Sequence, residues 1–125
     1  MATYYIDSIN GSDSNDGLSD STPWRTVPVQ SGYGVGNTWL LKRGCVFSPI
    51  DMIFTGNPAN ESQRVTYGAY GDLSAPPPKI DATGVAYGMR LQNKNYVTVQ
   101  DIDIYNSTGG GLQVLNNVTR ACNYF

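Results

Sequence analysis

The sequence contains no histidine, and it has only two cysteines. The absence of histidine excludes every catalytic mechanism or metal site that needs an imidazole group. Cys45 and Cys122 stand 77 residues apart with no CxxC spacing, which disfavours a structural zinc site. We interpret both thiols as small apolar groups that point inward, with a disulfide as the alternative.

Charge and long apolar runs are also scarce. Eight basic and ten acidic residues give a formal net charge of −2, and the basic residues are spread along the chain, so we expect no nucleic-acid partner. No apolar run approaches the roughly 20 residues that cross a bilayer, so we expect no membrane insertion. Residues 1–5 lack the basic start and the apolar stretch of a signal peptide.

Glycine and tyrosine, by contrast, are plentiful, with 14 and nine copies. Together with many Asn, Ser and Thr residues they predict short strands and frequent turns in one all-β domain. The predicted strands are 3–7, 37–44, 50–54, 64–67, 78–81 and two strands within 96–105. One short helix is predicted to start at Thr22-Pro23, where a hydroxyl precedes a proline.

The last part of the chain nearly repeats itself. Residues 88–93 and 111–116 align with a shift of 23, and residues 96–99 find a weaker echo in 117–120. A fixed period of this size, filled with short strands, is typical of a solenoid. Asn93 and Asn116 occupy the same place in the two repeats, which predicts a structural ladder of stacked Asn side chains at a turn.

A change of phase marks a predicted corner in the chain. Val97 and Val99 alternate with polar residues, and Ile102 and Ile104 then continue the alternation one position out of phase. Because no Gly or Pro causes the change, we expect a corner at residues 100–101 that joins two strands facing one core.

An acidic loop near the start of the chain raises the question of calcium. Residues 10–17 contain no apolar side chain, but the EF-hand spacing fails because Ser12 and Ser14 stand where the first two ligands belong. We therefore expect no metal and no cofactor, with calcium as the less favoured alternative. The Asp and Asn oxygens are expected to accept hydrogen bonds from backbone N–H groups of the loop.

Three blocks of sequence in this order carry a family resemblance. They are Tyr5-Ile6-Asp7 with 10–17 and 22–26, then 41–47 with 65–71, and finally 95–104. This combination resembles the pectate-lyase-like superfamily of right-handed parallel β-helix proteins, which includes secreted polysaccharide lyases and bacteriophage tailspikes. The resemblance implies a short solenoid of few coils with an N-terminal capping segment. We expect residues 1–49 to form the cap and first strands, and residues 50–125 to form the coils.

The strand alternation places several polar side chains on the outer face. We predict that four of them contact carbohydrate, because a ring can pack on a sugar and charged groups can bond its hydroxyls: Arg90, Asp103, Tyr105 and Gln113. The alternative is an ordinary solvated sheet face. These residues do not form the paired carboxylates of a glycosidase, so the catalytic residues are unknown and we do not expect this 125-residue chain to be active by itself.

The resemblance implies a carbohydrate-directed module. Our first hypothesis is part of a phage tailspike or tail fibre with an adhesive or structural role, forming a homotrimer on the virion and binding polysaccharide. The alternative is the N-terminal portion of a secreted polysaccharide lyase or glycoside hydrolase whose active site lies outside this chain. A third hypothesis is a purely structural assembly module, in which an open sheet edge pairs with another chain.

Overall fold

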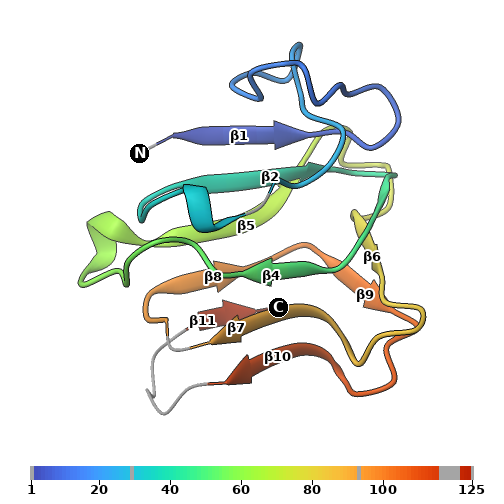
Figure 1. Ribbon diagram of the computed structural model, residues 1–125. Coiled ribbons are helices and arrows are strands. Elements are labelled where there is room, and N and C mark those ends of the chain that lie inside the picture. The colour runs from blue at the N-terminus through green and yellow to red at the C-terminus, as the bar shows by residue number, and fades with distance from the viewer. Residues whose placement is uncertain (1, 29, 93, 116–121, 125) are drawn as a thin grey trace.

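The structure is a computed structural model that describes residues 2–28, 30–92, 94–115 and 122–124, with only the backbone for 112–115 and 122–124. The described residues contain no α-helix and consist of short strands, turns and two 3-10 helices (Figure 1). The strands are β1 (Thr3–Ile6), β2 (Thr38–Lys42), β3 (Val46–Phe47), β4 (Ile50–Met52), β5 (Val65–Tyr70), β6 (Lys79–Asp81), β7 (Tyr87–Gln92), β8 (Val97–Val99), β9 (Asp103–Tyr105), β10 (Gly111–Leu115) and β11 (Cys122–Tyr124). The 3-10 helices are η1 (Gln30–Gly32) and η2 (Glu61–Gln63). The all-β class is therefore confirmed.

The strands form three parallel sheets. Sheet A has the order β1-β2-β5-β8-β11, sheet B has the order β3-β6-β9, and sheet C has the order β10-β7-β4. From β2 onward the chain visits sheets A, B and C in turn and then returns to A beside the strand it laid down before (Figure 1). Each sheet therefore gains one strand per circuit, and its neighbours are distant in sequence.

One hydrophobic core receives side chains from all three sheets. Strand β2 buries every second residue, and β8 buries Val97 and Val99 while Thr98 stays partly exposed. This alternation follows from the two-residue period of a strand. The fully buried side chains include Leu41 from sheet A, Ile80 from sheet B and Leu91 from sheet C, and they belong to one cluster.

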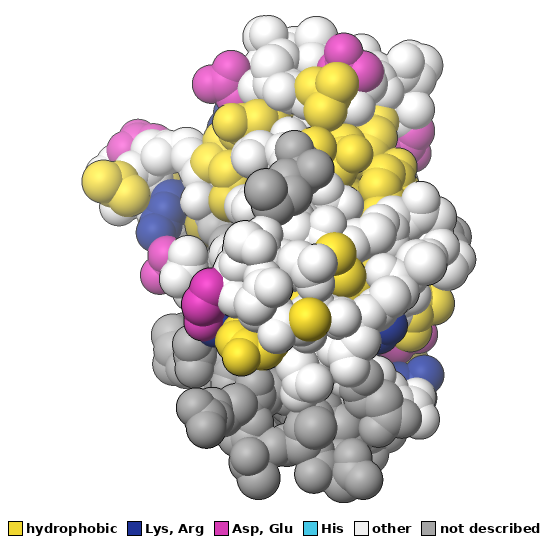
Figure 2. Space-filling view, turned by 90° about the vertical axis from the view of Figure 1, so that its left-hand side faces the viewer, with side chains coloured by type: hydrophobic (Ala, Val, Ile, Leu, Met, Phe, Trp, Pro, Cys, Tyr) yellow, Lys and Arg dark blue, Asp and Glu magenta, His cyan; other side chains and the backbone are white. Residues whose placement is uncertain are grey.

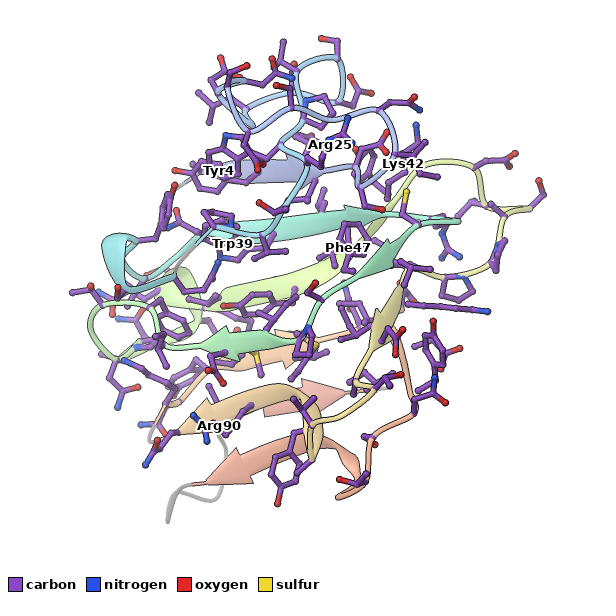
Figure 3. The ribbon with its side chains drawn as sticks, turned by 45° about the vertical axis from the view of Figure 1, so that its right-hand side comes forward. Tyr4, Arg25, Trp39, Lys42, Phe47 and Arg90 are labelled. Carbon is purple, nitrogen blue, oxygen red and sulfur yellow. The ribbon has the colours of Figure 1, made fainter. Side chains whose placement is uncertain are left out.

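Aromatic rings stack along the inner side of sheet A. Tyr4 pairs in register with Trp39, and Trp39 pairs with Tyr67. The ring centroids lie 4.7 Å apart in the first pair and 6.4 Å apart in the second. Trp24 adds a further ring, stacked on Tyr4 at 5.1 Å. Figure 3 labels Tyr4 and Trp39 at the side where β1 begins, and Figure 2, which looks onto that side, shows hydrophobic side chains gathered in its upper half.

The predicted repeat is confirmed in part. Leu112 pairs with Met89 and Leu115 pairs with Gln92, which is the expected shift of 23. The weaker echo at 117–120 is wrong as a guide to pairing, because β8 pairs with Cys122–Tyr124 instead. The predicted ladder of Asn93 and Asn116 lies outside the described residues.

The predicted corner is confirmed. Strand β8 ends at Val99 and β9 begins at Asp103, so the chain leaves sheet A and enters sheet B across residues 100–102. Asp101 adopts φ 57°, a left-handed conformation that Asp tolerates better than most residues. The side chains of Val99 and Ile102 are both buried, so the two strands face one core.

The predicted helix at Thr22-Pro23 is wrong. Trp24 is extended there and forms a parallel bridge with Ile6. Its N–H donates to the carbonyl of Tyr5 at 3.0 Å, and its carbonyl accepts from the N–H of Asp7 at 2.8 Å. This pairing covers the outer edge of β1, and its hydrogen bonds and the ring stacking of Trp24 outweigh the local proline signal.

Candidate functional site

The carboxylates of the acidic loop accept hydrogen bonds from nearby backbone N–H groups. Asp13 accepts hydrogen bonds from the N–H groups of Arg25 and Thr26 at 3.0 and 2.9 Å, and these bonds lower its pKa, that from Thr26 most strongly. Asp16 accepts from the N–H of Leu18 at 3.0 Å. The described residues contain no group of three or more His, Cys, Asp or Glu side chains that could hold a metal ion.

Asp7 anchors the loop to the body of the protein. One carboxylate oxygen accepts from the N–H groups of Ile9 and Asn10, each at 2.9 Å, and from the buried thiol of Cys45 at 3.5 Å. The other lies 3.4 Å from the ammonium group of Lys42. Burial by itself raises the pKa of Asp7, but these hydrogen bonds and the lysine charge together lower it. Cys45 thus points inward as expected, whereas the side chain of Cys122 lies outside the described part.

Replacing Asp7 by asparagine should weaken folding and reduce its acid sensitivity. Because the folded pKa of Asp7 is below 3.8, the ionised form adds stability above about pH 4 that is lost as the pH falls through the folded pKa. We expect Asp7→Asn to lower the free energy of unfolding by roughly 1.5–3 kcal/mol at pH 7. Between pH 4 and 2 the unfolding free energy of this variant should fall less steeply than that of the wild type. Urea unfolding at several pH values measures both effects.

The control for this variant is Asp72→Asn. Asp72 also accepts a hydrogen bond from the backbone, that of Ser74, but it lies in an exposed turn, so its replacement should change the unfolding free energy by less than about 0.5 kcal/mol. Equal acid sensitivity of the wild type and Asp7→Asn would contradict the role given to Asp7.

Arg90 faces a carboxylate on the neighbouring strand of sheet C. Asp51 on β4, Arg90 on β7 and Gln113 on β10 are in register. The Nε atom of Arg90 lies 3.2 Å from Oδ1 of Asp51, and the two side chains are 46% and 54% exposed. An ion pair this exposed adds little to stability, so both groups are available to a ligand. For Gln113 the structure gives the backbone register with Arg90.

The Arg90 hollow, a depression of 340 Å³, surrounds this ion pair. Its other walls come from the turn before β4 and from the start of β7, where Pro49, Ala86 and Tyr87 lie. Figure 3 shows Arg90 on the lower part of the molecule, beside β7. The hollow therefore combines a cation, an anion, a tyrosine ring and apolar surface, which is a mixture suited to a polyhydroxylated ligand.

Sequence reasoning missed Asp51. Its only signal was its position between Ile50 and Met52, which are both buried, so that Asp51 had to point outward. Nothing in the sequence showed that β4 lies against β7, because residues 51 and 90 are far apart along the chain.

Asp103 and Tyr105 do not join Arg90. Both lie on β9 of sheet B, where Asp103 is in register with Lys79 and Tyr105 with Asp81. The Nζ atom of Lys79 lies 5.9 Å from the centroid of the Tyr105 ring. The four predicted sugar-contacting residues are thus divided between two sheets, and a sugar contact at Asp103 and Tyr105 stays a separate prediction.

The chain is similar to known proteins in both sequence and fold. No protein-family model matches the chain. The chain is similar to a curated lacto-N-biosidase of Bifidobacterium longum subsp. longum, with 26% identity in an alignment of 130 positions that covers 83% of this chain and 8% of that protein. No helix in the described part of this chain is long and apolar enough to cross a membrane.

The fold of the chain is also similar to that of solved structures. Two crystal structures of the GH136 lacto-N-biosidase from Eubacterium ramulus resemble this chain over 84% of its length and 20% of theirs. The selenomethionine derivative has a TM-score of 0.68 at 24% identity, and the native protein has 0.66 at 25% identity. The chain thus spans a fifth or less of the length of these proteins.

These similarities correct the family resemblance drawn from the sequence blocks. The proteins that the chain resembles are lacto-N-biosidases, which are glycoside hydrolases, and not phage tailspikes or tail fibres. The first hypothesis, an adhesive or structural part of a phage tailspike or tail fibre, is therefore wrong. The motifs misled because short strands, Asn-rich turns and the Trp24 block report parallel-sheet geometry, which many unrelated activities share.

Proposed function

We propose that this chain is a portion of a carbohydrate-active protein of the glycoside hydrolase type, and that the Arg90 hollow binds part of an oligosaccharide. The observation that carries this proposal is the similarity to lacto-N-biosidases in both sequence and fold over more than four fifths of the chain. It agrees with the earlier alternative of a hydrolase portion. The ligand class that follows is an oligosaccharide containing lacto-N-biose.

We propose in addition that the three sheets are the faces of a right-handed parallel β-helix. The support is the repeated order of sheets A, B and C along the chain and the parallel pairing of each strand with the one laid down a circuit earlier. Within this fold, residues 1–49 would be the cap and first strands, and 50–125 the coils. The trimer, and a location on a virion or outside the cell, stay predictions.

The chemistry of the Arg90 hollow favours binding over cleavage. The guanidinium of Arg90 donates hydrogen bonds and the carboxylate of Asp51 accepts them, so the pair can hold two neighbouring sugar hydroxyls, while Tyr87 offers a ring for the apolar face of the sugar. Glycosidases commonly use two carboxyl groups, and Asp51 is the one carboxylate among the described residues that line the hollow. Hydrolysis by the whole protein would then use residues outside this hollow.

Calorimetric titration with lacto-N-biose tests the binding proposal. We expect the chain to bind the disaccharide, and Arg90→Ala to weaken binding at least about tenfold, because a charged hydrogen bond is worth roughly 1.5–3 kcal/mol. Asp51→Asn should weaken it as well, because the amide accepts more weakly than the carboxylate. Circular dichroism of each variant checks that the fold is intact.

The matched control is Arg43→Ala. This arginine lies in the turn between β2 and β3, and its side chain donates a long hydrogen bond of 3.5 Å to the carbonyl of Ala75. Its removal should leave the affinity for lacto-N-biose within twofold of the wild type. If the folded wild-type chain shows no affinity for the disaccharide, or if Arg43→Ala and Arg90→Ala weaken binding equally, the proposed site is wrong.

A further inference from the structure

The Arg90 hollow adjoins two further hollows. A second hollow of 240 Å³ is lined by Pro28, Asp51 and Ile53, and a third of 220 Å³ is lined by Arg25, Val46 and Ser48. All three include Pro49, and the second shares Ile50 and Asp51 with the first and Val27 with the third. We call this row of adjoining hollows the Pro49 groove. In Figure 3, Arg25 lies near the top of the molecule and Arg90 in its lower half.

The sizes of the hollows favour one long ligand over three small ones. Binding pockets for small molecules usually hold about 300–1,000 Å³, and only the Arg90 hollow reaches this range by itself. The two others are useful to a ligand that also occupies the neighbouring hollow. A chain of linked units that follows the groove past Pro49 meets this requirement.

Exposed apolar side chains follow the groove. Val46, Ile53 and Val85 are 47%, 46% and 41% exposed, and each lines a different one of the three hollows. They make up half of the large hydrophobic side chains that are exposed in the described part of the protein. Exposed apolar surface collected along one depression is typical of a binding surface.

The edges of two sheets lie along the same line. Strands β3 and β4 are the outer strands of sheets B and C, so part of their backbone N–H and C=O groups point away from the sheet. Among the described residues, no backbone hydrogen bond joins 25–28 to these strands, although both segments line the groove. A sugar hydroxyl both donates and accepts, so it matches either kind of backbone group.

We infer that the Pro49 groove binds an extended oligosaccharide, with one end at Asp51 and Arg90 and the other at Ser48 and Arg25. The hydroxyl groups of Ser8, Thr26 and Ser48 supply polar contacts at the far end, and Val46 and Pro49 supply apolar contacts to the sugar rings. This inference rests on the proposed function, since it extends the site at the Arg90 hollow. The chain should therefore bind longer oligosaccharides more tightly than a disaccharide.

A series of ligands of increasing length tests this inference. Calorimetry with lacto-N-biose and with tri- and tetrasaccharides that carry it should show affinity rising at least about tenfold with length in the wild-type chain. Ser48→Trp places a large ring in the third hollow from an exposed turn position. We expect this variant to bind the disaccharide within twofold of the wild type and to lose the gain from the longer ligands.

The control is Leu73→Trp, which adds the same ring at a position that is 84% exposed and outside the groove. This variant should keep the rise in affinity with ligand length. Amide NMR shifts of Val46, Ser48 and Ile53 should change with the tetrasaccharide and not with the disaccharide. Suppose that the chain binds the disaccharide and that Arg90→Ala weakens this binding. If affinity then does not rise with ligand length, or if Ser48→Trp keeps the rise, the groove is wrong and the proposed function stands.

A complete lack of sugar binding in the folded wild-type chain overturns the proposed function and the groove together. Light scattering over a range of protein concentrations adds a further outcome. If the mass rises with concentration and Ser48→Trp prevents the rise, then the groove is a contact between two copies of the chain through the edges of β3 and β4, and the oligosaccharide inference is wrong.

Discussion

Trp39→Ala should lose about 3–5 kcal/mol of unfolding free energy, which is a large part of the roughly 5–15 kcal/mol available to a domain. Trp39 is fully buried. Its ring stacks on Tyr4 and Tyr67 and meets the edge of Tyr33 at a centroid distance of 4.9 Å. Removing it opens a cavity between three strands of sheet A. Urea unfolding followed by far- and near-ultraviolet circular dichroism measures the loss.

Two further variants make this prediction specific. Trp39→Phe keeps an aromatic ring in the stack and loses no hydrogen bond, because the indole Nε1 has no partner among the described residues, so we expect it to cost clearly less than the alanine variant. Leu73→Ala shortens a side chain that is 84% exposed and should change stability by less than about 0.5 kcal/mol. A Trp39→Ala protein as stable as Leu73→Ala would contradict the role of the stack.

Gly11→Ala should destabilise the loop that covers β1, by about 3 kcal/mol. A Cβ atom at this position would overlap the backbone carbonyl of Trp24 and lie 2.5 Å from the carbonyl oxygen of Asp7. Neither carbonyl can move freely, because that of Trp24 accepts from the N–H of Asp7 and that of Asp7 accepts from the N–H of Gly11. Thermal unfolding followed by circular dichroism measures the effect.

Gly34→Ala is the matched control. A Cβ atom at Gly34 has no heavy atom within 4 Å, so this variant should have a melting temperature close to that of the wild type. We expect Gly11→Ala, in addition, to expose Trp24 to solvent, because the loop that holds its ring in place would be displaced. Normal stability together with unchanged tryptophan fluorescence would show that the loop adapts to the methyl group, against our prediction.

The sequence carried enough local information to predict most strands. The alternation around Val97 and Ile102 gave both strands and the corner between them, because the side-chain period of a strand is a local property. The repeat with a shift of 23 gave the pairing of β10 with β7 because equivalent residues in successive circuits meet similar neighbours. The helix predicted at Thr22-Pro23 failed because a pairing with β1, which is distant in sequence, decides the conformation there.

The candidate site was predictable only in fragments. The outward direction of Arg90 followed from the alternation, but its partner Asp51 did not, because the register between β4 and β7 joins segments 39 residues apart. Asp103 and Tyr105 also point away from the core, yet they lie on another sheet. Alternation tells whether a side chain points outward, but it does not tell which sheet carries it.

The sequence by itself determined the all-β class, the short strands, the corner at 100–101 and the lack of any imidazole group in this chain, because these follow from residue types and local periods. Only the tertiary structure decided which strands pair, that Asp51 meets Arg90, and that three hollows meet at Pro49. These are relations between segments that lie far apart along the chain, and they are fixed by packing into one core and by backbone hydrogen bonds between circuits.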